Sequence, residues 1–164
     1  MTDLQAYQDP VAIQRVLYAA RTIAIVGLSS NELRDSFFVG SYLKQHGYRV
    51  IPVNPRETEV LGETSYPTLR QAHDALPDKI DIVDVFRAPE AVPGIAREAV
   101  AIGASALWCQ LGVVNTEGAQ IAASAGLRVI MDRCLKTEHA RYVGRMGWLG
   151  LDTQGITAVR GDIG

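Results

Sequence analysis

Small and polar residues follow the first strongly apolar segment of the chain, which spans residues 22–26. They are Gly27, Leu28, Ser29 and Ser30, with Ser36 at the expected start of the next helix. A glycine lets the backbone approach a phosphate closely, and hydroxyls and amides at a helix start favour an anion. The loop therefore predicts a pyrophosphate site, with plain turn formation as the alternative role for Gly27.

A second polar loop follows the apolar run of residues 48–53 and consists of Asn54, Pro55 and Arg56. An NAD-binding domain usually has an Asp or Glu here, which accepts hydrogen bonds from the ribose hydroxyls. An arginine instead favours an extra phosphate, which NADP carries on the 2′ position and coenzyme A on the 3′ position. The residues alone leave both ligands open, and a solvated surface arginine is the alternative reading of Arg56.

A third candidate position ends the apolar run of residues 80–86, where Val85, Phe86 and Arg87 stand. An adenine could lie against the aromatic ring or the guanidinium group. The alternative is that Phe86 belongs to the core. Gly112 lies in a further turn, after residues 106–110, which chain reversal explains equally well.

Several sequence motifs of nucleotide-binding and catalytic sites are missing. The chain has neither GxGxxG nor GxxxxGK[ST], which disfavours the dinucleotide fingerprint and a nucleotide hydrolase. Asp81 and Asp84 are three residues apart on an expected strand, so they face opposite sides and form no catalytic dyad. We interpret His46, His73 and His139 as structural or solvated, and expect no catalytic residue, no metal ligand and no enzymatic activity.

Cys134 is a separate hypothesis. Arg133 and Lys136 are close to it in the sequence, and nearby cations favour a thiolate. A thiolate near the sulfur of coenzyme A could form a mixed disulfide, whereas a buried structural cysteine is the alternative.

Alternating helical and strand patterns provide the elements that would position these residues. Buried strands are expected over residues 22–27, 48–53, 80–86, 106–110 and 128–132. A lead-in helix is expected over residues 9–20, with Asp9 as its cap. Two further helices are expected to begin with Ser36 and Thr116 as their caps. Three more are expected to start at Leu69, Pro89 and Thr137. This alternation predicts an α/β fold, a Rossmann-like doubly wound parallel sheet of about five strands in a single domain. Ligands of such sheets bind beyond the carboxyl ends of the strands.

Length and composition suit one globular domain. The chain has 164 residues, of which 48% are hydrophobic, and a formal net charge of −2, which does not suit a nucleic-acid partner. The first ten residues contain no apolar run, and no stretch approaches the roughly 20 apolar residues of a membrane span. We therefore expect a soluble cytoplasmic protein with no membrane partner, a domain over residues 1–143 and a C-terminal extension over 144–164.

Five segments together resemble the small stand-alone CoA-binding proteins of bacteria and archaea. They are Gly27–Ser30, Gly47–Pro55, Asp81–Arg87, Leu107–Gly112 and Met131–Lys136. That family is similar to the N-terminal CoA-binding domain of the succinyl-CoA synthetase α subunit, and the resemblance covers about Val11 to Tyr142. It implies a Rossmann-like fold with coenzyme A across the carboxyl ends of the strands.

The resemblance also implies roles for the candidate residues. Gly27, Ser29 and Ser30 would hold the pyrophosphate, Arg56 would lie near the 3′-phosphate, and Val85, Phe86 and Arg87 would line the adenine pocket. Gly112 and the turn of Met131, Arg133 and Cys134 would face the pantetheine arm. The synthetase has its phosphorylated histidine in a second domain, which this chain does not contain, so ligase activity is not expected.

The expected function is therefore non-catalytic binding of coenzyme A or an acyl-CoA, for sequestration, sensing or delivery. One alternative is an NADP-dependent oxidoreductase or another nucleotide-using enzyme. A second is a ligand-responsive regulatory subunit that acts through a protein partner, which the sequence permits but does not identify.

Overall fold

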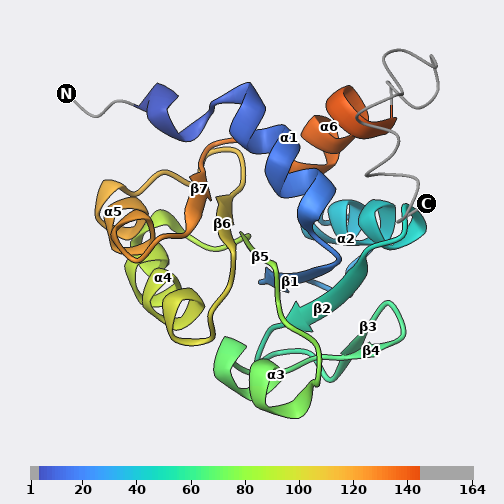
Figure 1. Cartoon of the computed structure of the whole chain (residues 1–164). Helices are drawn as coiled ribbons and strands as arrows, with labels where there is room; N and C mark the ends of the chain where they lie inside the picture. The colour runs from blue at the N-terminus through green and yellow to red at the C-terminus, as the bar shows by residue number, and fades with distance from the viewer. Residues whose placement is uncertain (1–3, 145–164) are drawn as a thin grey trace.

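The computed structural model describes residues 4–144, and a five-stranded parallel sheet forms the centre of this region. Its strands are β1 (Thr22–Val26), β2 (Arg49–Val53), β5 (Ile82–Val85), β6 (Ala106–Cys109) and β7 (Arg128–Ile130). Their spatial order is β2-β1-β5-β6-β7, and every neighbouring pair is parallel (Figure 1). The chain runs outward from β1 to β2 and then crosses to β5 on the other side of β1. This reversal is the point at which doubly wound sheets bind ligands, and it confirms the predicted fold class.

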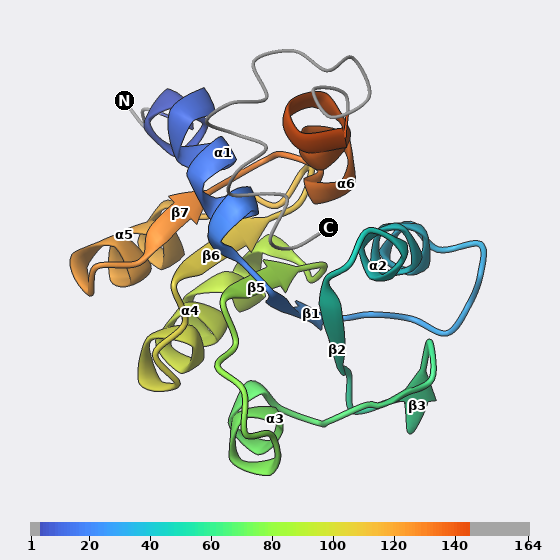
Figure 2. The same cartoon turned by 45° about the vertical axis from the view of Figure 1, so that its right-hand side comes forward.

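Helices cover both faces of the sheet. The helices α1 (Pro10–Ala19), α2 (Asp35–Gln45) and α6 (Leu135–His139) pack on one face, and α3 (Leu69–Ala75), α4 (Val92–Ala101) and α5 (Thr116–Ser124) pack on the other (Figures 1 and 2). Alternate strand residues divide between the faces, as Ile23 and Ile25 pack with the first set and Ala24 with the second. Short 3-10 segments at Leu4–Tyr7 and Pro89–Ala91 precede α1 and α4, and a π-helical turn, Ala140–Gly144, follows α6.

Two of the three predicted helix caps were wrong. Asp9 caps α1 as predicted, because its carboxylate accepts a hydrogen bond from the Ala12 amide at 3.1 Å. Arg34, not Ser36, precedes α2, and the Ser36 hydroxyl accepts from the Ser29 amide instead. At α5 the cap is Asn115 rather than Thr116, since the Asn115 side chain accepts from the Gly118 amide at 2.9 Å.

A small hairpin between β2 and α3 was not predicted. It pairs β3 (Glu59–Val60) with β4 (Glu63–Thr64) in antiparallel register. Its turn residues Leu61 and Gly62 both have positive φ, 55° and 79°. Each strand has only two residues and a leucine occupies a turn position that usually holds Asn, Asp or Gly, so the sequence contains no hairpin signal.

The two lateral strands of the sheet contact segments from elsewhere in the chain. Beyond β7, the Met131 amide donates to the Tyr7 carbonyl oxygen at 3.0 Å, and the Gln8 side chain donates to the Met131 carbonyl oxygen at 3.2 Å. Along β2, the Tyr66 amide donates to the carbonyl oxygen of Pro52 at 3.1 Å. Pro52 lies inside β2 rather than at its end, which an outer strand permits because its free side needs no ladder donor.

Of the predicted C-terminal extension 144–164, residues 145–164 lie outside the described residues. No helix between residues 4 and 144 is long and apolar enough to cross a membrane.

Candidate functional site

The loops that follow β1 and β2 are joined by hydrogen bonds at the carboxyl edge of the sheet. The Asn54 side-chain amide donates to the Leu28 carbonyl oxygen at 3.0 Å. The Glu57 carboxylate accepts from both the amide and the hydroxyl of Ser30, at 2.8 and 3.0 Å. A carboxylate therefore occupies the donors that were predicted to hold a phosphate.

The other polar groups of the β1–α2 loop are engaged within the protein. The Gly27 amide donates to Val53 at 2.8 Å, and the Ser29 amide donates to the Ser36 hydroxyl at 3.0 Å. The Ser29 hydroxyl accepts from the Asn31 amide at 3.0 Å. Ser30 is exposed. A movement of the Glu57 side chain away from the loop would therefore free the Ser30 amide and hydroxyl to bind another acceptor.

Gly27 is required by a close approach of two protein segments. Its φ is +95°, and a Cβ there would lie 2.4 Å from the Phe86 carbonyl oxygen and 3.2 Å from the Arg87 Cδ. The loops after β1 and β5 thus meet at Gly27, at the reversal point of the sheet. The predicted reason for this glycine was approach to a phosphate, whereas the structure shows an approach to backbone.

A cavity of about 670 Å³ opens beside this contact, at the carboxyl ends of β5 and β6. This volume lies within the range of small-molecule sites. Three predicted site residues line it, namely Phe86, Arg87 and Cys134. Its other lining residues are Asp35, Phe38, Val39, Ala88, Gln110, Leu111, Val113, Lys136 and Thr137.

The lining combines cations with apolar surface. Arg87 and Lys136 are exposed and contribute two positive charges, against one negative charge from Asp35. Phe38 and Leu111 are 56% and 66% exposed, which is unusual for large apolar side chains and fits a ligand with an apolar part. The cavity is therefore suited to a molecule that carries both negative charge and apolar segments.

Five further predicted residues lie in the core or in turns and not on the lining of this cavity. Leu28, Val85 and Met131 are buried in the core. The Gly112 amide donates to the Asp132 carboxylate at 2.7 Å. Arg133 reaches away to the N-terminal segment, where it donates to the Gln8 side chain at 3.1 Å. These residues support the turns around the cavity rather than its surface.

Pro55 and Arg56 are exposed on the loop after β2, and the Arg56 amide donates to the Asn54 side chain at 2.9 Å. Within residues 4–144 the Arg56 guanidinium has no ion-pair partner. It therefore remains a candidate contact for a phosphate.

The two cysteines have different environments. Cys109 is fully buried, and burial, followed by the charge of Asp84, raises its pKa to about 12. Cys134 is half-buried at the cavity. Asp84 is completely buried, and burial, followed by the charge of Cys134, raises its pKa well above the usual value for a carboxyl group.

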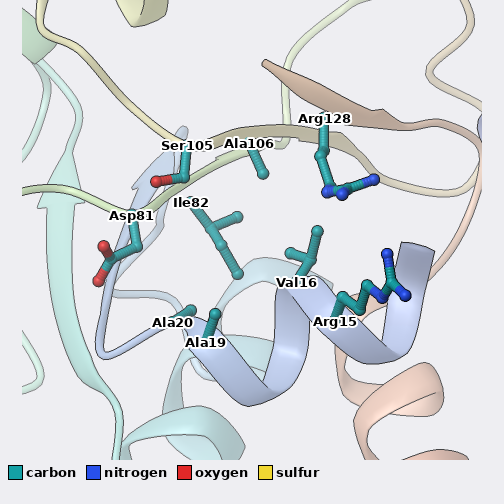
Figure 3. A pocket seen from close by; sticks show the side chains of 9 residues that line it. All are labelled: Arg15, Val16, Ala19, Ala20, Asp81, Ile82, Ser105, Ala106 and Arg128. Atoms are coloured by element: carbon teal, nitrogen blue, oxygen red, sulfur yellow. The ribbon is translucent and has the colours of Figure 1, made fainter. Parts of the chain in front are cut away.

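A smaller hollow of about 290 Å³ lies at the opposite, amino ends of the strands (Figure 3). Arg15 from α1 and Arg128 from β7 point into it across apolar side chains. On its other side the Asp81 carboxylate accepts from the Arg21 and Thr22 amides, at 2.9 and 3.0 Å, which fixes the start of β1. None of the predicted site residues lines this hollow.

Two of the three histidines belong to an aromatic cluster around α2 and α6. The His139 ring lies 5.2 Å from the His46 ring, between centroids, and its Nδ1 is 2.8 Å from the Tyr42 hydroxyl. His73 is on α3, on the other face of the sheet. None of the three lines the large cavity.

Sequence reasoning missed Glu57, Phe38 and Lys136 as part of the site. Glu57 directly follows the predicted loop, and an acid at the end of the second strand is a known ribose-binding signal that could have drawn attention to it. The exposure of Phe38 on a helix has no sequence signal.

The comparisons agree with this architecture. A family model described as "CoA binding domain" matches residues 21–140. The protein YneT of Bacillus subtilis, described as uncharacterized, is 40% identical over 128 residues, which is 78% of this chain and 92% of that protein. A hypothetical protein of Pyrococcus horikoshii has a solved structure that is 36% identical, with a TM-score of 0.80, and the match covers 88% of this chain and 99% of that one.

A more distant structural match is a dinucleotide-forming acetyl-coenzyme A synthetase of Ca. Korarchaeum cryptofilum. It is 24% identical with a TM-score of 0.57, over 69% of this chain and 26% of the synthetase chain. At this identity the match shows a shared fold alone.

Proposed function

Because the chain belongs to the CoA-binding domain family, we propose that it binds coenzyme A or an acyl-CoA at the carboxyl edge of its sheet, without transforming it. The observation that carries the proposal is the cavity beside the Gly27 contact. It lies next to the reversal point of the sheet and combines Arg87 and Lys136 with exposed apolar side chains. Coenzyme A has the matching chemistry, with phosphates at one end and a long, mostly uncharged pantetheine arm at the other.

The pyrophosphate would take the place of the Glu57 carboxylate at Ser30. Both are anions, and the Ser30 amide and hydroxyl already donate to an anionic oxygen, at 2.8 and 3.0 Å. Arg56, one residue before Glu57, would then meet the 3′-phosphate. Binding at this loop is therefore an exchange of one anion for another.

The pantetheine arm would occupy the cavity. Phe38 and Leu111 offer apolar contacts, and Cys134 lies on the cavity lining with them. Phe86 and Arg87 line the cavity and also meet Gly27. An adenine, or the start of the pantetheine arm, would contact the Phe86 ring there.

Binding without catalysis is favoured by the composition of the lining. The ionisable groups of the lining are Asp35, Arg87, Cys134 and Lys136. The oxidoreductase alternative would need one proton donor placed next to the carbon that accepts the hydride. Cations and apolar side chains suit holding a ligand for sequestration, sensing or delivery.

Titration calorimetry with coenzyme A, dephospho-CoA and NADP tests the proposal. We expect coenzyme A to bind most tightly and dephospho-CoA more weakly. Tight binding of NADP with no binding of coenzyme A would overturn the proposal in favour of the oxidoreductase alternative. Recovery of coenzyme A unchanged after prolonged incubation with the protein checks the non-catalytic part.

A further inference from the structure

Asp84 is an anomaly in the core of the described region. It is 0% exposed, and neither of its carboxyl oxygens has a hydrogen-bond partner there. It sits in the middle of the sheet, level with Ile25 of β1 and Trp108 of β6. A buried carboxyl group without a partner destabilises a protein, so a functional reason for it has to be sought.

The side chain of Asp84 lies on the side of the sheet that carries the cavity. Val83 and Val85 pack with the α4 and α5 layer, so Asp84 faces the α2 and α6 layer, as Ile82 does. Phe86, two residues further along, lines the cavity. Trp108, which is level with Asp84 on β6, donates to the carbonyl oxygen of Arg133, the neighbour of Cys134, and the interaction with Cys134 contributes to the raised pKa of Asp84.

Cys134 itself is held in place and open to the cavity. The Trp108 indole donates to the carbonyl oxygen of Arg133 at 2.8 Å, and the Glu138 amide donates to the carbonyl oxygen of Cys134 at 3.0 Å. Both bonds fix the backbone around the cysteine. Lys136 and Arg87 line the same cavity as Cys134, whereas Cys109 is buried.

We propose that Cys134 forms a mixed disulfide with the pantetheine sulfur of the bound ligand, and that Asp84 is the positioning residue for this thiol. The inference rests on the proposed function, because the pantetheine arm must enter the cavity. The oxidant is a pantetheine-type disulfide, such as the disulfide of coenzyme A.

The Cys134 thiol loses its proton to solvent, and the thiolate attacks one sulfur of the ligand disulfide. A bond forms between the Cys134 sulfur and that sulfur, and the ligand's own S–S bond breaks. The leaving thiolate takes a proton from solvent and departs as a free thiol. Burial raises the pKa of Asp84, so this carboxyl group stays neutral and adds a dipole, not a second negative charge, beside the reacting thiolate.

Intact-mass analysis after incubation with CoA disulfide tests the thiol. The wild type and Cys109→Ser should each gain one CoA unit that a reductant removes, and Cys134→Ser should gain none. Glutathione disulfide, which lacks the nucleotide, should react roughly tenfold more slowly at equal concentration. An adduct on Cys134→Ser, or none on the wild type, would overturn the proposal.

Two substitutions of similar size test Asp84. Asp84→Asn keeps a neutral hydrogen-bond donor and should react within about threefold of the wild type, whereas Asp84→Leu has no donor and should react roughly tenfold more slowly. Circular dichroism establishes that both variants are folded. Equal rates in the two variants would refute the role of Asp84.

A separate measurement distinguishes failure of this inference from failure of the proposed function. Reduced coenzyme A, titrated calorimetrically with a reductant present, should bind the wild type without forming an adduct. Binding of reduced coenzyme A, combined with no adduct after incubation with CoA disulfide, refutes the mixed disulfide alone. No binding of reduced coenzyme A refutes the proposed function.

Discussion

The Glu57 carboxylate accepts two hydrogen bonds from Ser30, at 2.8 Å from the amide and 3.0 Å from the hydroxyl. The β2 loop thus supplies an anion to the β1 loop in the ligand-free protein. Any phosphate that binds at Ser30 competes with this internal carboxylate.

Glu57→Gln should therefore tighten coenzyme A binding, by roughly three- to tenfold, because a neutral amide competes less well for the Ser30 donors. Calorimetry measures the affinity. Glu59→Gln, which removes an exposed acid from the adjacent β3, is the matched control. Equal gains in the two variants would mean that net charge, not the Ser30 contact, is responsible.

Arg56→Ala should reduce the affinity for coenzyme A by about three- to fivefold, as expected for one exposed ion pair, and leave dephospho-CoA unaffected. The preference between the two ligands would then disappear. Arg128→Ala removes the same charge at the opposite end of the strands and should change neither affinity. A preference that survives in Arg56→Ala would move the 3′-phosphate away from this residue.

Gly27→Ala should destabilise the protein more than Gly126→Ala. The two glycines have nearly the same φ, +95° and +93°, but a Cβ on Gly126 meets nothing within 4 Å. The left-handed conformation alone costs about 1–2 kcal/mol, and the clash at Gly27 should add a further ~1–3 kcal/mol. Urea denaturation gives both values, and similar losses would show that the Phe86 carbonyl moves aside easily.

Asp84→Asn should stabilise the protein increasingly as the pH rises. Burial raises the pKa of Asp84 in the folded state, so below its ordinary pKa both states are protonated and no cost arises. Above it the unfolded chain ionises while the folded protein keeps its proton, and stability falls by up to about 1.4 kcal/mol per pH unit until the folded pKa is reached.

Urea denaturation at about pH 4, 6 and 8 checks this dependence. The gain from Asp84→Asn should be smallest at the lowest pH and largest at the highest. Asp74→Asn, at an exposed position on α3, should give a small difference from the wild type throughout. A gain for Asp84→Asn that does not change with pH would contradict the raised pKa.

The sheet followed from the sequence because its strands are buried on both faces and leave continuous apolar runs between helical patterns. The contacts that the candidate site residues make were predicted only in part. The sequence indicates which residues follow each strand, but not what each side chain meets across space. Gly27 was assigned to a phosphate and contacts Phe86, and Arg133 was assigned to the ligand and contacts Gln8. Asp84 has an ordinary place in an apolar run, and only its complete burial without a partner distinguishes it.

The contacts of Tyr7 with Met131 and of Tyr66 with Pro52 have a consequence for solubility and assembly. An open sheet has two outer strands whose unpaired backbone groups can template the addition of a strand from another molecule, which is a route to aggregation. Here the chain's own backbone bonds to the sheet at both margins. The segment with Tyr7 and Gln8 precedes the region that the family model matches. Trimming the chain to that region would therefore remove the backbone contact between Tyr7 and Met131 that covers the β7 margin of the sheet.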